Sequence, residues 1–166
     1  MNIFYTNDCY KKCAEDMPDK LLVKMVLETA QMLSTTHRVL DGDEYADKVG
    51  MYKLTHKNHP CSIWAREISG NYTWLFLHFI ALCNEYTYRY GKVHKTDSKL
   101  REPLRGLPLN IKYGVKTRPA QAMPDKYKTD DATVAYRNYM IHEKHYAEWN
   151  KNRPRPKWWS LNLKAA

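Results

Sequence analysis

The chain has 166 residues, of which 43% are hydrophobic, and carries a formal net charge of +9. This length fits one domain with one core, and no apolar run approaches the ~18–20 residues of a membrane span. The first residues lack the basic and apolar regions of a secretory signal and are expected to begin the fold. We therefore expect one helical domain over residues 1–166, located in the cytoplasm, or in the host cytoplasm if the protein is viral.

The first strong helix is predicted from about Pro18 to Ser34. Asp16 is the expected N-cap, and Pro18 suits the first turn. Apolar residues occupy nearly every side, so this helix should be largely buried. Its polar residues recur at spacings of four, four and three, which places them in one narrow stripe: Lys20, Lys24, Glu28 and Gln31.

This stripe has two interpretations. Burying a lone charge is costly, so a charged line on an apolar helix must be solvated, paired or open to a cleft. In the first interpretation it is a solvated strip with ordinary salt bridges. In the second, Glu28 lies between cations at the floor of a site for an anionic substrate.

A polar loop precedes a short helical stretch expected at about 63–67. Imidazole, amide, guanidinium and indole groups lie close together here, and these groups contact phosphates and bases. The alternative is a polar turn that caps the helix. The residues concerned are His56, Lys57, Asn58, His59, Trp64 and Arg66.

Two more main helices are predicted, at about 72–90 and 131–149. Gly91 should end the first of them, and Asp130 or Asp131 should cap the second. We thus expect an all-α fold of three main helices packed on one core, with long irregular loops and little or no sheet.

The remaining segments are basic. Residues 92–129 are rich in proline and glycine, so a long irregular loop is expected there, with Arg118 among its cations. The tail, residues 150–166, alternates cations with prolines before Lys157, Trp158 and Trp159. These two indoles would either stack on a base or close the core.

Composition favours a nucleic-acid partner and no cofactor. A basic surface attracts phosphates, and the 13 Tyr and 5 Trp supply rings that stack on bases. No Walker, GxGxxG, GxSxG or HExxH signature is present. Cys9 and Cys13 could join His56 and His59 around zinc, but no CxxC pair is present, so we expect no metal and reduced cysteines.

Four features together resemble the phage and bacterial pyrimidine-dimer DNA glycosylases of the endonuclease V type. The short start, Met1-Asn2-Ile3-Phe4, leads directly into the first helix. The spacing from Lys20 to Glu28 resembles the family's catalytic helix with its essential glutamate. Lys57-Asn58-His59-Pro60 is similar to a segment of the bacterial members, and Glu143-Lys144, Arg153-Pro154 and the aromatic tail resemble the family's C-terminal part. The chain is also similar to uncharacterised phage proteins of similar length.

The resemblance implies a monomeric DNA-repair enzyme that flips a nucleotide out of double-stranded DNA and releases a damaged or modified base. It implies that the α-amine of Met1 attacks C1′, with a Schiff-base lyase step to follow, while Glu28 stabilises the cationic sugar. The phage enzyme uses a small residue exposed by removal of methionine, whereas Asn2 disfavours that removal here. Leu27 also stands where the family has an arginine.

The residues expected to hold DNA extend beyond the catalytic pair. They are Asn2, Lys20, Lys24, Gln31, His56, Lys57, Asn58, His59, Trp64, Arg66, Arg118, Lys157, Trp158 and Trp159. Two other functions stay open. One is a phage enzyme that acts on modified bases or nucleotides without a Schiff base. The other is a non-catalytic protein that binds nucleic acid or a host factor.

Overall fold

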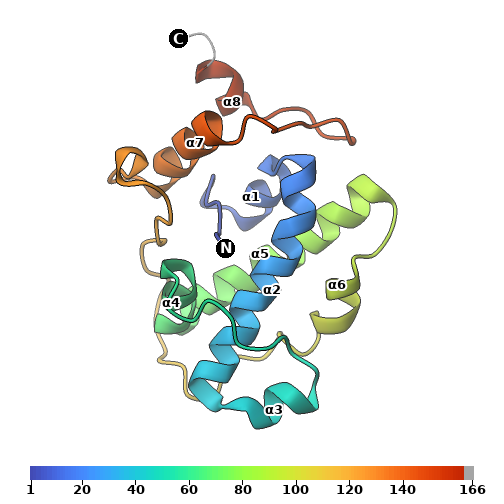
Figure 1. The fold of residues 1–166 in the computed structure, drawn as a ribbon, viewed down its shortest axis with the longest axis vertical. Coiled ribbons are helices and arrows are strands. Elements are labelled where there is room, and N and C mark those ends of the chain that lie inside the picture. Colours follow the sequence, from blue (N-terminus) through green and yellow to red (C-terminus); the bar gives the residue numbers. More distant parts are fainter. Residues whose placement is uncertain (163–166) are drawn as a thin grey trace.

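The computed structural model describes residues 1–162, so the last four residues of the predicted tail lie outside it. Within this range are eight α-helices, one short 3₁₀ helix and no strands, which confirms the all-α prediction (Figure 1). The elements are α1 (Tyr10–Asp16), α2 (Asp19–Asp41), α3 (Asp43–Lys48), α4 (Pro60–Glu67), α5 (Ser69–Tyr90), α6 (Lys95–Leu100), η1 (Asp125–Tyr127), α7 (Ala132–Glu143) and α8 (Lys157–Asn162).

The long helices α2 and α5 form the centre of the molecule, with α1 and α4 packed against α5 (Figure 1). Helix α2 continues to Asp41, seven residues beyond the predicted end. The prediction was wrong because residues 35–38 are polar, yet the structure buries all four. Tertiary and backbone partners bind most of their polar groups, as in the bonds from Arg38 to Asp43 and Asp47.

The predicted caps are partly confirmed. Gly91 ends α5 in the left-handed conformation, with φ 66°, and the Asp131 side chain accepts hydrogen bonds from the first amides of α7. Asp16 is not the N-cap of α2. It ends α1, and its carboxylate accepts hydrogen bonds from Thr6 and Trp158 instead.

Helix α7 ends at Glu143, six residues before the predicted end. The chain beyond it leaves the helix because tertiary hydrogen bonds replace the helical ones. Glu148 accepts from the backbone of Asp19, the Trp149 indole donates to the carbonyl of Asp16, and the amide of Asn150 donates to the Asp19 carboxylate.

The long segment 92–129 is less irregular than expected, since it contains α6 and η1. Its middle part runs along the start of α5, where Ser69 and Gly70 donate backbone hydrogen bonds to the carbonyls of Lys112 and Gly114. A side chain on Gly70 would clash here, because its Cβ would lie 2.3 Å from the nitrogen of Lys116.

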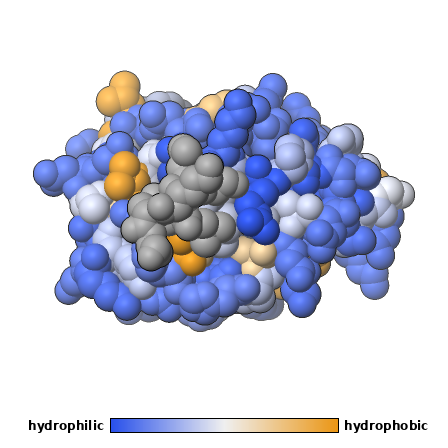
Figure 2. All heavy atoms as spheres, turned by 90° about the horizontal axis from the view of Figure 1, so that it is seen from above, coloured by the Kyte–Doolittle hydropathy of each residue, from blue (hydrophilic) through white to orange (hydrophobic). Residues whose placement is uncertain are grey.

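Viewed from above, over the end of the molecule that carries α7 and α8, the surface is mostly hydrophilic with scattered apolar residues (Figure 2). None of the helices in residues 1–162 has the length and apolar character needed to cross a membrane.

Candidate active site

The N-terminal segment is held rigidly inside the fold. Residues 2–6 are all buried. The Asn2 side chain accepts hydrogen bonds from the backbone of Ile3 and Phe4 and donates one of 2.7 Å to the carbonyl of Ala122. Phe4 has a φ of 44°, a strained value for a bulky residue, which the surrounding packing must maintain. The position of the Met1 amine is therefore fixed by the fold.

That amine lies beside the polar stripe of α2. The Met1 nitrogen is 3.5 Å from Oε2 of Glu28, and Oε1 of the same carboxylate is 3.2 Å from Nζ of Lys24. The Glu28 side chain is 12% exposed and that of Lys24 is 66% exposed. A shielded carboxylate thus lies between a primary amine and a solvated cation, an arrangement suited to moving protons and stabilising positive charge.

The side chain of Met1 belongs to the same packed arrangement. It is only 2% exposed, and its sulfur accepts a 3.5 Å hydrogen bond from the hydroxyl of Ser62 on α4. The chain folds around Met1, so loss of this residue would open a void and move the amine onto Asn2.

His59, the N-cap of α4, lies within electrostatic range of the Met1 amine and Glu28. Its Nδ1 accepts a hydrogen bond from the amide of Cys61 and caps α4, so the neutral ring carries its proton on Nε2. Burial, then the charges of the N-terminal amine and of His56, lower the pKa of His59, and only Glu28 opposes them. His59 is therefore neutral near pH 7 and presents an N–H donor.

The rest of the polar loop is open to solvent. His56, Lys57 and Asn58 are exposed, and Arg66 donates a 2.6 Å hydrogen bond to the carbonyl of Lys57, which fixes the loop. His56 has a φ of 48°, another strained conformation. The sequence-predicted stripe and loop thus lie on elements that meet at Met1.

Several residues predicted to contact DNA make contacts within the fold. Trp64 is buried in the core, and Trp159 packs against Trp149 with ring centroids 5.0 Å apart. Trp158 is half-buried and donates to the Asp16 carboxylate. Arg118 donates to backbone carbonyls just before α7. Asn2, Trp64 and Trp159 are therefore buried, whereas the Arg118 side chain is 56% exposed and still reaches solvent.

Other residues predicted to contact DNA are accessible to solvent. Lys20 and Lys157 are exposed and Gln31 is half-buried. Lys20 lies one turn before Lys24, and Gln31 lies near one turn after Glu28, so both extend the stripe along α2.

Sequence reasoning missed the contribution of α7. Arg137 donates to the carbonyl of Thr6, and Lys144 lies 5.6 Å from the ring centre of Phe4. Helix α7 and its C-cap therefore place two cations against the N-terminal segment. The sequence carried this signal, because the helix predicted over 131–149 places these two residues seven apart on one face; in the structure Lys144 is the C-cap of α7. Residues 116–157 hold ten Lys or Arg against five Asp or Glu, so this part of the chain is basic.

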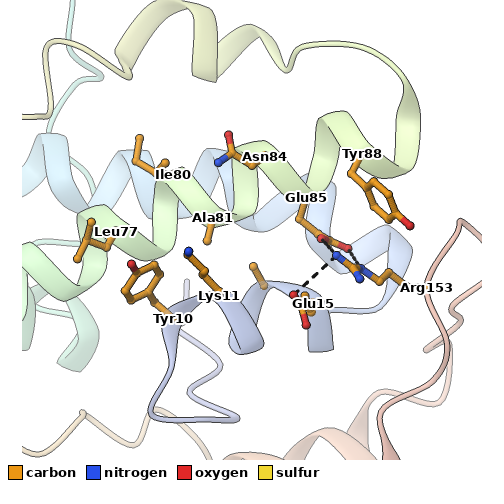
Figure 3. A pocket seen from close by; sticks show the side chains of 11 residues that line it. Tyr10, Lys11, Glu15, Leu77, Ile80, Ala81, Asn84, Glu85, Tyr88 and Arg153 are labelled. Atoms are coloured by element: carbon orange, nitrogen blue, oxygen red, sulfur yellow. Dashed lines mark hydrogen bonds and ion pairs between the residues drawn. The ribbon is translucent and has the colours of Figure 1, made fainter.

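The C-terminal segment is fixed by an ion network beside a hollow of about 350 Å³ between α1 and α5 (Figure 3). Arg153 reaches from this segment to Glu85 on α5, at 2.8 Å, and to Glu15 on α1, at 3.7 Å. Burial raises the pKa of Glu85, but the hydrogen bonds from Arg153 and Arg89 outweigh it and lower that pKa overall.

Within residues 1–162, no three His, Cys, Asp or Glu side chains are arranged to hold a metal ion. The four cysteines are free, and only Cys9 is exposed.

The model of a family described as pyrimidine dimer DNA glycosylase matches residues 1–99, more than half of the chain. This range contains Met1, Lys24, Glu28 and His59. Neither the comparison with curated proteins nor that with solved structures gives a match.

Proposed function

Because the chain belongs to the pyrimidine dimer DNA glycosylase family, we propose that it releases a damaged or modified base from double-stranded DNA, with the α-amine of Met1 as the nucleophile. The observation that carries this proposal is the 3.5 Å separation between the Met1 nitrogen and the Glu28 carboxylate. An amine attacks only when it is unprotonated, and once the nitrogen has bonded to C1′ a carboxylate at this distance can take the proton that the nitrogen then loses.

The first step forms one bond and breaks another. The Met1 amine attacks C1′ of a flipped nucleotide, and the bond from C1′ to the base breaks with its electron pair on the base. Glu28 stabilises the positive charge on the sugar as this occurs. The Nε2–H of His59 donates a hydrogen bond to the departing base, which takes its proton from water.

The second step gives the covalent intermediate. Glu28 accepts a proton from the nitrogen now bonded to C1′ and passes it to the ring oxygen as the C1′–O4′ bond opens. The product is an imine between Met1 and C1′, which can continue to strand cleavage. Exposed Lys20, Lys24, Lys57 and Lys157 would neutralise phosphates around this site.

Borohydride trapping tests the proposal. Intact-mass spectrometry first verifies that the purified protein retains Met1. This protein should then form a covalent adduct with duplex DNA that contains an abasic site or a UV lesion. Acetylation of the α-amine should abolish the adduct. Glu28→Gln should slow base release about 10²–10⁴-fold with little change in DNA affinity, while exposed Glu67→Gln should be neutral.

The other two functions predict different results. An enzyme without a Schiff base would release a base after acetylation and give no adduct. A non-catalytic binder would be indifferent to Glu28→Gln. A folded protein that binds these duplexes yet yields no adduct on any of them contradicts the proposed nucleophile.

A further inference from the structure

A second hollow, of about 490 Å³, lies at the C-terminal end of α2. Asp41, in its lining, is thirteen residues, or about 20 Å along the helix, from Glu28, and the hollow shares no residue with the group formed by Met1, Lys24, Glu28 and His59. Its lining residues come from α2, α3 and the segment after α6: His37, Asp41, Glu44, Tyr45, Lys48, Gly106, Leu107 and Leu109.

The hydrogen bonds of Tyr72 determine the protonation of His37. The Tyr72 hydroxyl is 2.8 Å from the carbonyl of Leu104 and 2.8 Å from Nε2 of His37. Its single proton goes to the carbonyl, which can only accept, so Nε2 of His37 must donate to the hydroxyl oxygen. The neutral ring, favoured because burial lowers the pKa of His37, then has a bare lone pair on Nδ1.

This lone pair has no hydrogen-bond partner, although the His37 side chain is 97% buried, that is, 3% exposed. Nδ1 faces Oδ2 of Asp41 at 4.0 Å, and the backbone of Gly106, which raises the pKa of His37, is a further acceptor, so acceptors face one another with no donor between them. A buried acceptor without a donor is costly in free energy, and a bound ligand with N–H groups would remove that cost.

Asp41 also builds the wall of the hollow. Its carboxylate is 11% exposed and accepts hydrogen bonds from the amides of Leu109 and Asn110, which hold their segment against α2. Glu44 adds a second carboxylate at the exposed start of α3. The C-terminal end of α2 contributes further partial negative charge.

The apolar part suits the carbon chain of a cation. Leu107 and Leu109 line one side, and the Tyr45 ring lies 6.2 Å from the His37 ring, where it can pack against an ammonium group. Lys48 is the one cationic side chain in the lining, and it is exposed on α3, free to turn toward solvent.

We propose that this hollow binds a protonated primary amine, which donates to Asp41 and His37 and lies against Tyr45. The acceptors, the negative charge and the apolar side all match an alkylammonium ion. The amine would come either from a free diamine or from a lysine side chain.

Calorimetric titration of the full chain tests this site with three probes: 1,4-diaminobutane, Nα-acetyl-lysine amide and the uncharged 1,4-butanediol. At least one amine should bind saturably, and the diol should not. Stronger binding of the diamine identifies a free diamine as the source, and stronger binding of the lysine derivative identifies a side chain. Saturation should also shift the NMR signals of the His37 ring.

Three variants locate the binding. His37→Phe, which removes the lone pair, and Asp41→Asn, which keeps an oxygen for the Leu109 amide, should each weaken amine binding at least tenfold, and Glu44→Gln several-fold. Glu67→Gln, an exposed control on α4, should have no effect. Circular dichroism checks that each variant is folded. The proposal is overturned if neither amine binds. It is also overturned if folded Glu44→Gln and folded His37→Phe bind the amines as tightly as the wild type does.

Discussion

The side-chain amide of Asn2 donates a hydrogen bond of 2.7 Å to the carbonyl of Ala122, which joins the N-terminus to the segment before α7. The same side chain accepts from the backbone of Ile3 and Phe4. One residue therefore sets the direction in which the chain, and with it the Met1 amine, enters the site.

Asn2→Leu should consequently misplace the amine without preventing folding. Leucine is bulky and keeps Met1 in place, but it makes none of the three hydrogen bonds. A displacement of about 1 Å can cost about 10²-fold in rate, so single-turnover base release should fall by that order while DNA affinity changes little. Asn7→Ala is the control, because it removes only an exposed hydrogen bond that the Asn7 side chain accepts from the amide of Cys9. Equal rates for Asn2→Leu and wild type would show that this contact does not position the nucleophile.

His59→Asn separates capping from hydrogen-bond donation. Asparagine is a good N-cap, so it can still accept from Cys61, but it lacks the Nε2–H in the same place. We expect base release to slow about tenfold or more with unchanged thermal stability. His94→Asn is the matched control, because His94 caps α6 in the same way by accepting from Thr96. If both variants retain full rate, His59 only caps its helix.

Lys57 should contact phosphate, since it is exposed on the loop that precedes α4. DNA affinity should fall steeply with salt, and Lys57→Gln should reduce the slope of log K against log salt by about 0.9. Lys92→Gln is the control, because Lys92 is exposed beyond the end of α5, and its slope should equal that of the wild type. Fluorescence anisotropy at several salt concentrations measures the slope for the wild type and for each variant. A Lys57→Gln slope identical to that of the wild type would show that Lys57 does not contact phosphate.

His78 should make the protein sensitive to acid. Burial lowers the pKa of His78 from 6.5 to about 4. The unfolded chain therefore binds the proton first, and stability present above pH 6.5 is lost as the pH falls toward 4. Between pH 7 and pH 5 this loss is about 2 kcal/mol.

Urea unfolding at pH 7 and pH 5 measures this effect. His78→Phe keeps a ring against Trp74, with which His78 stacks, and should reduce the pH-dependent loss. His145→Gln, which replaces an exposed histidine, should leave the pH-dependent loss of stability unchanged. An undiminished loss in His78→Phe would assign the acid sensitivity to other groups.

Arg89 should be essential for stability. Its side chain is fully buried and pairs with Glu85 and Asp19. Arg89→Met leaves buried carboxylates short of a partner and should cost about 3–5 kcal/mol of unfolding free energy. Arg105→Met, which breaks the exposed pair with Glu102, should cost no more than about 1 kcal/mol. Comparable losses in the two variants would contradict the importance of burial.

Local sequence determined the helical character of this protein and one half of the candidate site. Helical periodicity alone places Lys24 one turn from Glu28, and the 3.2 Å pair agrees with it. Gly91 and Asp131 end and begin their helices through contacts within a few residues. Such features depend on neighbours in sequence, so the pattern of residue types was sufficient.

The tertiary structure decided which residues come together across the chain. The Met1 amine reaches Glu28 because residues 2–6 are buried and Asn2 bonds to Ala122. Polar residues 35–38 continue α2, since Thr35, His37 and Arg38 find hydrogen-bond partners outside the helix. Trp159 turns into the core for the same reason. These outcomes depend on contacts between residues distant in sequence, whose free energy outweighs local preference, and no local pattern records them.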